Sequence, residues 1–326
     1  MAEAVSETVL ITGGAGFIGS NFVRYFLQKY PNKKVIVLDK LTYCGNMDNL
    51  DGLEDTNRYL FVPGDICDEW LVSSLMKQVS SVIHFAAESH VDNSIKDPFA
   101  FTRTNVLGTH VLLEAARKCG ITKFIHMSTD EVYGPVLEGS SKESDQLNPS
   151  SPYSASKAAA ELIVKGFMTT FNLPVIMVRC SNAFGPYQYP EKIIPLFVTN
   201  LLENKKVPVY GDGKQIRSWI FTEDVCSAID FVFQQGKNGE VYNIPGSCEF
   251  PNLELTTRIL SLLGKDHSYI EHVEDRLAHD RRYSVDGSKL LQMGWKHAHN
   301  FDSALKETVQ WYVQNEKWWK KIKVGF

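Results

Sequence analysis

Short apolar runs separated by longer amphipathic stretches make up the first half of the chain. The runs are rich in β-branched residues and cover residues 8–12, 34–38, 59–62, 82–87, 124–127 and 174–179. Between them, apolar side chains recur with helical spacing, as at residues 22–27, 99–118 and from 153 to about 171. Strands that alternate with helices in this way predict an α/β fold with a doubly wound parallel sheet.

The alternation is lost after residue 186, where proline, aromatic and basic residues are mixed. Residues 181–186 contain a Gly-Pro pair and are predicted to form a loop. Residues 218–221 and 241–244 have strand-like patterns, and we expect at least one of them to return to the main sheet. Residues 301–319 predict an amphipathic helix whose tryptophans pack against the core. We therefore predict a large domain, residues 1–185 with returning segments near 217–245, and a smaller, discontinuous C-terminal domain, residues 186–216 and 246–326.

Composition narrows the class of protein. The 326 residues are 44% hydrophobic and 22% charged, which is typical of a globular protein with a large core. A net charge of -4 gives no general basic field for nucleic acid. The six cysteines lack C-x-x-C spacing and no Cys/His cluster matches a zinc pattern, so we expect reduced thiols and no metal. No apolar run could span a bilayer and no signal-peptide pattern begins the chain, which favours the cytoplasm.

A glycine-rich turn joins the first predicted strand to the first predicted helix. Gly13, Gly16 and Gly19 follow the apolar run at 8–12. Small residues let the backbone approach a pyrophosphate, and a helix N-terminus offers N–H donors to it. Asp39 ends the second run, about 20 residues past the last glycine, where a carboxylate binds the adenosine ribose hydroxyls. Because an acid there repels a 2′-phosphate, a Rossmann-type domain that binds NAD rather than NADP is predicted.

Polar or small residues also follow the ends of the other predicted strands. Asp65 follows the third run, Ala86 and Ala87 close the fourth, and a Ser-Thr-Asp-Glu run at 128–131 follows the fifth. Ligands of open parallel sheets bind beyond the carboxyl ends of the strands, so these residues should line one site. Asp65 is a candidate to contact the adenine, although it could instead cap the next helix.

Tyr153 and Lys157 are four residues apart in a predicted helix, so they lie on one face, one turn from each other. Free tyrosine has a pKa of about 10 and is a poor base at neutral pH. A nearby ammonium favours the phenolate, so we expect Lys157 to lower the pKa of Tyr153. Such a phenol can take the proton of an alcohol while a cofactor takes the hydride. The same spacing also occurs on solvated helix faces, and the nucleotide-binding signature upstream is what favours the chemical interpretation.

These motifs together resemble the extended short-chain dehydrogenase/reductases, and within them the nucleoside-diphosphate-sugar 4,6-dehydratases, over nearly the whole chain. The glycine turn and the Tyr-Lys pair are typical of the superfamily, whereas the Thr-Asp-Glu triplet at 129–131 marks the dehydratases. The other matching segments are residues 86–92, 132–134, 179–182, 185–192, 208–213 and 275–280.

The resemblance implies a reaction that oxidises C4 of a hexose, eliminates water across C5 and C6, and returns the hydride to C6, with NAD unchanged at the end. Tyr153, supported by Lys157, would take the C4 hydroxyl proton. Glu131 would take the C5 proton, and Asp130 would protonate the leaving C6 hydroxyl. Adjacent carboxyls can divide these roles only if their surroundings separate their pKa values. Thr129 would hydrogen-bond the C4 oxygen. The simpler interpretation of Asp130 and Glu131 is a capped helix start, with Asp130 as the N-cap.

The resemblance also implies two sets of binding residues. The residues expected to contact NAD are Gly13, Gly16, Phe17, Ile18, Gly19, Asp39, Lys40, Thr42, Asp65, Ile66, Phe85, Ala86, Ala87, Ser89, Thr104, Tyr153, Lys157 and Ala183. The residues expected to contact the nucleotide sugar are Ser89, His90, Thr129, Asn182, Lys192, Pro208, Tyr210, Arg217, Asn252, Arg276 and His279. Among these, the two arginines are candidates for the pyrophosphate and Tyr210 for stacking on the base.

Some choices stay open at this point. Positions that depart from the family pattern are Asn93, Ala183, Phe184, Ser218, Val225, Leu277 and Ala278. They leave the base undecided between thymine and uracil, which differ by one ring methyl. A nucleotide-sugar 4-epimerase, which has no need of Asp130 and Glu131, and a non-catalytic NAD-binding scaffold are the alternative functions. Family members pair the helices at 99–118 and 153–171 between subunits, so we expect a homodimer with neither nucleic-acid nor membrane partners.

Overall fold

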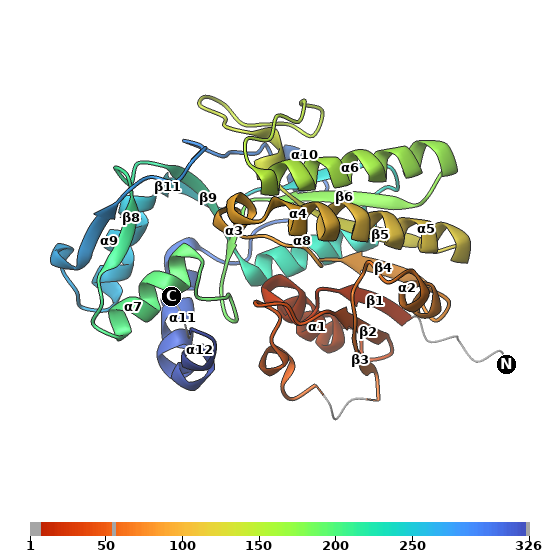
Figure 1. Ribbon diagram of the computed structural model, residues 1–326, viewed down its shortest axis with the longest axis horizontal. Coiled ribbons are helices and arrows are strands. Elements are labelled where there is room, and N and C mark those ends of the chain that lie inside the picture. The colour runs from red at the N-terminus through yellow and green to blue at the C-terminus, as the bar shows by residue number, and fades with distance from the viewer. Residues whose placement is uncertain (1–7, 54–56, 324–326) are drawn as a thin grey trace.

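The computed structural model describes residues 8–53 and 57–323, and in them a seven-stranded parallel sheet is the central feature, with the strand order β10-β6-β5-β4-β1-β2-β3 (Figure 1). Its strands are β1 (Thr8–Thr12), β2 (Lys34–Asp39), β3 (Tyr59–Pro63), β4 (Ser81–His84), β5 (Lys123–Thr129), β6 (Val175–Cys180) and β10 (Val241–Ile244). The strand order reverses between β1 and β4, which opens a crevice at the carboxyl ends of these two strands. The predicted doubly wound fold is confirmed.

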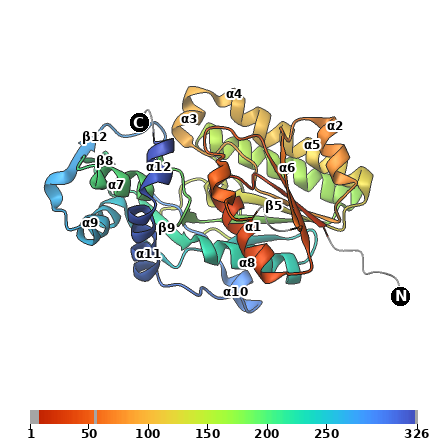
Figure 2. The same cartoon turned by 90° about the horizontal axis from the view of Figure 1, so that it is seen from below.

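Helices cover both faces of this sheet, as Figure 2 shows. On one face lie α1 (Phe17–Lys29) and α8 (Thr222–Gln235), and on the other lie α2 (Glu69–Met76), α5 (Thr109–Cys119) and α6 (Pro152–Phe171). Each face has its own apolar core, with Phe22 and Phe26 in the first and Leu112 and Val164 in the second. Apart from the edge strand β3, which is partly exposed, the strands are buried on both faces, so their sequences are continuous apolar runs rather than alternating ones.

The single helix predicted at 99–118 is wrong in detail. The segment contains α4 (Pro98–Phe101), a π-helical stretch η2 (Thr102–Gly108) and then α5, and the short helix α3 (Val91–Lys96) precedes it. Asn105, in the π-helical stretch, is buried and binds both backbone groups of Glu88, at 2.9 and 3.0 Å, and the Ser156 hydroxyl at 2.8 Å. A π-bulge of this kind places one side chain out of helical register, and here it ties the loop after β4 to α6.

A second, smaller lobe holds two short sheets, one ordered β11-β9-β7 and one that pairs β12 with β8. Their strands are β7 (Asn182–Phe184), β8 (Val207–Tyr210), β9 (Ile216–Phe221), β11 (Cys248–Pro251) and β12 (Ile270–Val273). The loop predicted at 181–186 is therefore wrong for its middle residues, because β7 pairs with β9 across 37 residues of sequence from Asn182 to Trp219. Of the two segments predicted as strands at 218–221 and 241–244, only the second, β10, returns to the main sheet. The division into two domains at the predicted boundaries stays a prediction.

The remaining elements surround the smaller sheets and connect the lobes. They are α7 (Ile193–Leu202), α9 (Asn252–Leu262), α10 (Ser288–Gln292), α11 (Phe301–Gln314), α12 (Glu316–Ile322) and the short 3-10 turns η1 (Met47–Leu50), η3 (Asp130–Tyr133) and η4 (His267–Tyr269). The predicted C-terminal helix is broken at Asn315. Trp319 bonds the Tyr312 carbonyl at 2.8 Å, and Trp318 bonds Asn49 of the larger lobe at 2.9 Å, so both tryptophans pack as predicted. Of the helices in residues 8–53 and 57–323, none has the length and apolarity needed to cross a bilayer.

Candidate active site

The glycine turn is shaped by contacts that exclude side chains. Gly13 has φ +70°, and a Cβ there would lie 2.5 Å from the backbone nitrogen of Ala86. A Cβ at Gly19 would lie 2.1 Å from the Gly13 carbonyl oxygen. Gly16 is the N-cap of α1, so the helix starts with no side-chain cap over its N–H groups. The first turn of α1 is thus built as a site for an anionic group such as a pyrophosphate.

Asp39 lies at the carboxyl end of β2, beside this turn. Its carboxylate accepts hydrogen bonds from the backbone of Ala15 at 2.9 Å and of Leu41 at 2.8 Å. Burial raises its pKa, and the two backbone donors oppose that rise. Each carboxylate oxygen keeps a second acceptor position, which ribose hydroxyls could use. Lys40 and Asp65, which were also predicted to contact NAD, form an ion pair at 2.8 Å. The N-cap of α2 is Asp68 rather than Asp65.

The carboxyl pair, Asp130 and Glu131, directly follows the last residue of β5. Thr129 is the last residue of β5, and η3 starts at Asp130. The Thr129 hydroxyl caps η3 by accepting from the Glu131 backbone at 3.3 Å, so Thr129, and not Asp130, is the N-cap. The cap leaves the side chain of Asp130 free of any structural capping role. Its Oδ2 atom is buried and has no hydrogen-bond partner in the part of the chain that the structure describes.

Helix α6 carries Tyr153 and Lys157 to the same place. The helix starts at a capping box between Ser151 and Ser154, with Pro152 in its first turn. Lys157 donates to the Met127 carbonyl of β5 at 2.6 Å, and Glu161, one turn further on, pairs with Arg179 of β6 at 2.6 Å. These two buried contacts fix the helix against the sheet, so that Tyr153 faces the end of β5.

The surroundings of Asp130 and Glu131 shift the pKa values of the two carboxyl groups differently. Desolvation raises the pKa of Asp130 to about 7, and the charge of Glu131 beside it acts in the same direction. Burial also raises the pKa of Glu131, but the positive charges of Arg217, Lys192 and Arg276 lower it again. The neighbouring charge thus adds to the rise in pKa at Asp130, whereas the cationic side chains act against it at Glu131, and a difference of this kind is what an acid and base pair requires.

The expectation that Lys157 lowers the pKa of Tyr153 is wrong for the protein without ligands. Burial raises the pKa of the phenol above its usual range, the charges of Glu131 and Asp130 raise it further, and the Thr129 hydroxyl lowers it. Burial lowers the pKa of Lys157 to about 8. The ammonium is bound to the Met127 carbonyl instead of the phenol, and this is why its charge does not offset desolvation.

One cleft contains most of the residues that the sequence singled out. All the residues predicted to contact NAD line it, from Gly13 and Asp39 at one end to Tyr153 and Lys157 at the other. The predicted catalytic residues line it as well, and so do four of the predicted substrate residues, Ser89, Thr129, Asn182 and Lys192. Their binding roles stay predictions. The lining also contains residues to which the sequence analysis assigned no individual role, which are Cys44, Gly45, Glu88, Cys180, Ser181, Gln188, Tyr189 and Glu191.

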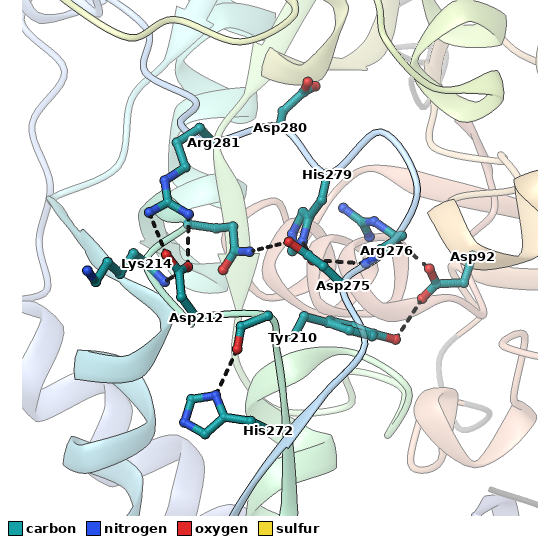
Figure 3. A network of polar contacts seen from close by, with 12 residues as sticks. Asp92, Tyr210, Asp212, Lys214, His272, Asp275, Arg276, His279, Asp280 and Arg281 are labelled. Atoms are coloured by element: carbon teal, nitrogen blue, oxygen red, sulfur yellow. Dashed lines mark hydrogen bonds and ion pairs between the residues drawn. The ribbon is translucent and has the colours of Figure 1, made fainter.

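The other seven predicted substrate residues lie outside the lining of this cleft, and three of them, Tyr210, Arg276 and His279, belong to a polar network of the smaller lobe. Figure 3 shows Asp92 of α3 facing Arg276, at 3.9 Å, and the Tyr210 hydroxyl, at 3.4 Å. His279 binds Asp275 at 2.6 Å, and the same carboxylate accepts from Gln215 at 3.0 Å. The network therefore joins the larger lobe, through Asp92, to the loop at 275–279.

Arg217 and the two asparagines are placed differently from this network. Arg217 is buried in β9, donates to the Asp280 carbonyl at 3.0 Å and lies over the Tyr283 ring at 4.4 Å. Its charge acts on both Glu131 and Asp130, so it faces the carboxyl pair. Asn182 and Asn252 each have a buried Oδ1 atom that lacks a hydrogen-bond partner within residues 8–53 and 57–323. Buried polar atoms of this kind are usually paired, and the binding roles of both asparagines stay predictions.

Together, the fold and the site define a class of protein: a dinucleotide-dependent enzyme that can oxidise an alcohol and pair that step with acid and base chemistry. The uncapped start of α1, the Asp39 carboxylate and the continuous cleft from Asp39 to Tyr153 fit an extended dinucleotide such as NAD. Where the structure describes the chain, no group of three or more His, Cys, Asp or Glu side chains could hold a metal ion.

Comparison with known proteins specifies the family. The chain belongs to the GDP-mannose 4,6 dehydratase family, whose model matches residues 10–308. It is 47% identical over 320 residues to a dTDP-glucose 4,6-dehydratase of Streptomyces niveus, covering 97% of this chain and 95% of that one. It is also 43% identical to a trifunctional UDP-glucose 4,6-dehydratase of Arabidopsis thaliana, covering 97% of this chain but 48% of that longer protein.

Solved structures give the same result. A dTDP-glucose 4,6-dehydratase of Streptomyces venezuelae, solved with NAD bound, superposes with a TM-score of 0.95 at 48% identity and covers 97% of this chain and 99% of that one. A UDP-glucose 4-epimerase of Thermotoga maritima reaches 0.88 at 28% identity, with 95% of this chain and 99% of that one covered. The predictions of the dehydratase family and of NAD as the cofactor are confirmed.

Proposed function

We propose that this protein is an NAD-dependent dTDP-glucose 4,6-dehydratase, which converts dTDP-glucose to dTDP-4-dehydro-6-deoxyglucose and water. The observation that carries the proposal is the carboxyl pair at the end of β5: Asp130 and Glu131 line the cleft that also contains Tyr153, and burial raises the pKa of Asp130 to about 7. A 4-epimerase needs no such pair. Curated relatives at 46–47% identity over most of the chain carry the same activity in their names.

When bound, NAD would be held by the glycine turn and Asp39 and would supply the two-electron chemistry, as the acceptor and then the donor of the hydride. The side chains handle the protons. Tyr153 takes the C4 hydroxyl proton as its phenolate, and the Thr129 hydroxyl, which lowers the pKa of this phenol, would hydrogen-bond the C4 oxygen. The carbonyl formed at C4 acidifies the C5 proton, which the Glu131 carboxylate removes. Asp130 gives its proton to the C6 oxygen, which leaves as water, and Glu131 then returns a proton to C5.

The smaller lobe holds the nucleotide in this proposal. Arg217, Arg276 and Lys192 supply positive charge for the diphosphate, and Asn182 and Asn252 supply side-chain amides whose Oδ1 atoms have no partner among the residues that the structure describes. Tyr210 is 38% exposed and is free to stack on the base. The NAD side is formed by the glycine turn, Asp39 and the other predicted residues of the cleft.

A UDP-glucose 4,6-dehydratase is the second candidate, because the Arabidopsis relatives of that name match nearly the whole chain at 42–43% identity. The two substrates differ in the base methyl and in the 2′-hydroxyl of the ribose. Incubating the purified protein with each nucleotide sugar, and weighing the product by mass spectrometry, separates the candidates. Loss of one water from dTDP-glucose at a higher kcat/KM supports the proposal, and preference for UDP-glucose supports the second candidate. An unchanged mass with inverted C4 would identify an epimerase, and no turnover would favour a scaffold.

We also propose that the protein forms a homodimer and is located in the cytoplasm. Phe99, Leu107 and Leu162 are 73%, 50% and 63% exposed on α4, η2 and α6. A depression on the same helices is lined by Phe99, Leu107 and Ile163 among others. An exposed patch of this kind is typical of a protein interface, and a second copy of the same helices would cover it. Light scattering should give the mass of a dimer, and a Leu107→Asp, Leu162→Glu variant should give that of a monomer. The six cysteines are free thiols, which suits a reducing compartment.

A further inference from the structure

Two segments from different lobes line the same part of the cleft. One is the loop at residues 40–46, which follows β2 in the larger lobe, and the other is the segment at 185–192, which joins β7 to α7 beside the smaller sheets. Their residues in the lining are Lys40, Thr42, Cys44, Gly45, Gln188, Tyr189, Glu191 and Lys192. A dinucleotide that extends along the cleft from the glycine turn towards Tyr153 therefore lies next to both segments.

A hydrogen bond joins the two segments. The Tyr43 hydroxyl donates to Glu191 Oε1 at 2.9 Å, and the Tyr43 ring meets the Tyr189 ring edge-on, with 5.5 Å between the centroids. The Glu191 side chain is only 3% exposed, and its other oxygen lies 3.6 Å from His90 Nδ1, which is beyond hydrogen-bond distance. Breaking the bond to Tyr43 would thus leave a buried carboxylate short of a donor, which costs more than the loss of an exposed hydrogen bond.

The loop that carries Tyr43 is tied at both ends to the predicted NAD site. Near its start, the backbone of Leu41 donates to the Asp39 carboxylate at 2.8 Å. At its end, the backbone of Asn46 donates to the Ala15 carbonyl, in the glycine turn, at 3.0 Å. Tyr43 thus extends from a loop whose two ends are fixed beside the groups expected to hold the ribose and the pyrophosphate.

The segment that carries Glu191 is fixed as well. The Tyr189 hydroxyl donates to the Ile322 carbonyl at 3.0 Å, and the Lys192 ammonium donates to the Ser89 carbonyl, in the loop after β4, at 2.8 Å. Since both segments are anchored on either side of the Tyr43 to Glu191 bond, separating them means breaking this bond rather than letting one loop follow the other.

We propose that the hydrogen bond from Tyr43 to Glu191 closes the cleft over bound NAD and must break before the dinucleotide can enter or leave. The bond joins two protein groups and uses no atom of the cofactor, so its loss should speed entry and exit alike and change the affinity little. In the proposed function one cofactor molecule serves both hydride steps of a turnover, and slow exit keeps it in place between them. That consequence rests on the proposed function, whereas the closing contact itself does not.

The test measures NAD exchange in the full-length protein. Tyr43→Phe removes the hydroxyl and keeps the ring against Tyr189. Protein loaded with radiolabelled NAD is mixed with excess unlabelled NAD, and the label that stays bound is followed over time. Equilibrium titration gives Kd, and the entry rate constant is the exit rate constant divided by Kd. We expect exit from Tyr43→Phe to be at least about tenfold faster than from wild type, as for loss of a hydrogen bond to a charged group, with Kd changed by less than about threefold.

Two further variants sharpen the result. Glu191→Gln keeps the size of the side chain and an acceptor oxygen but loses the charge, and it should speed exit by only about threefold, because a neutral hydrogen bond is roughly half as strong as a charge-assisted one. Tyr269→Phe, in η4 and outside the lining of the cleft, is the matched control and should exchange NAD at the wild-type rate.

An exit rate in Tyr43→Phe equal to that of wild type would overturn the proposal. A higher Kd with an unchanged entry rate would overturn it as well, because the contact would then support the bound cofactor without closing its path. Thermal melting shows whether each variant folds, and if Tyr43→Phe does not, an unchanged exit rate in Glu191→Gln contradicts the proposal instead. The measurement uses no sugar nucleotide, so failure of the wild type to dehydrate dTDP-glucose would defeat the proposed function and leave this result standing.

Discussion

The two halves of the cleft are built in different ways. On the NAD side, most of the predicted residues stand at the end of a parallel strand or in the turn after it. The backbone positions them, as it places Gly13 against Ala86 and Asp39 on the N–H groups of Ala15 and Leu41. On the nucleotide-sugar side, the predicted residues come from separate small sheets and loops. Their side chains are positioned by contacts with other side chains, such as those of Asp92 with Arg276 and Tyr210. We infer that the first half is a fixed frame and that the second half can exchange its internal contacts for those of a ligand.

The largest effect should come from the carboxyl pair, which lies where the two halves meet. Asp130→Asn removes the proposed acid and Glu131→Gln the proposed base, and each should lower kcat by about 10²- to 10⁴-fold. Steady-state rates of product formation measure this, with the exposed Glu307→Gln as the matched control. A loss under tenfold in both variants would remove the pair from the chemistry.

The fixed frame should not tolerate a single added methyl group. In Gly19→Ala the new Cβ would lie 2.1 Å from the Gly13 carbonyl oxygen, so the turn must open and NAD binding should weaken by at least about tenfold, or 1.4 kcal/mol. The NAD content of the purified protein and titration with added NAD measure this. Gly166→Ala, in α6, meets no atom within 4 Å and should instead stabilise the fold by about 0.5–1 kcal/mol. Equal NAD binding by both variants would contradict a rigid turn.

Asp130 should also cost stability when it ionises. Its pKa is about 7 in the folded protein, against about 3.9 in an unfolded chain, so the folded state binds the proton more tightly. Stability from this group is therefore complete below pH 4 and is lost as the pH rises to about 7. Asp130→Asn cannot ionise and should be more stable than wild type at pH 8, by at most about 4 kcal/mol, with the difference vanishing towards pH 4. Urea unfolding across this range, with Glu307→Gln as control, checks the sign.

The smallest effect should come from the contacts within the nucleotide-sugar half. Asp92 is partly exposed, and its ion pair with Arg276, at 3.9 Å, should contribute only about 0.2–1 kcal/mol. Asp92→Asn should therefore change the melting temperature little and alter KM for dTDP-glucose by less than about fivefold, with kcat unchanged. A large fall in kcat would mean that Asp92 acts on the reacting groups.

The sequence predicted the features that depend on local patterns and missed those that depend on contacts between distant segments. The glycine turn, Asp39 and the Tyr-Lys pair were predictable because a local pattern determines a strand end, a tight turn or a helix face. The π-helical stretch was not, since it depends on Asn105 reaching Glu88 and Ser156. Strand β7 was not predictable either, because its partner β9 lies far along the chain.

The electrostatics of the site were even less accessible to sequence. The spacing of Tyr153 and Lys157 suggested a direct interaction, yet Lys157 binds the Met127 carbonyl and burial raises the pKa of the phenol. The pKa of Glu131, and so its difference from that of Asp130, likewise depends on Arg217, which is more than 80 residues away in the chain. Motifs thus identified the reacting groups, and only the folded structure indicates their protonation states.

The most direct test of the account follows the hydrogen at C4 of the sugar. The protein, loaded with NAD and given dTDP-glucose that carries deuterium at C4, should yield a dehydrated 4-keto product with that deuterium at C6 and no requirement for further NAD. Deuterium retained at C4 in a product of unchanged mass would contradict the account, because the hydride would then have returned to the carbon it left and the carboxyl pair would have removed no water.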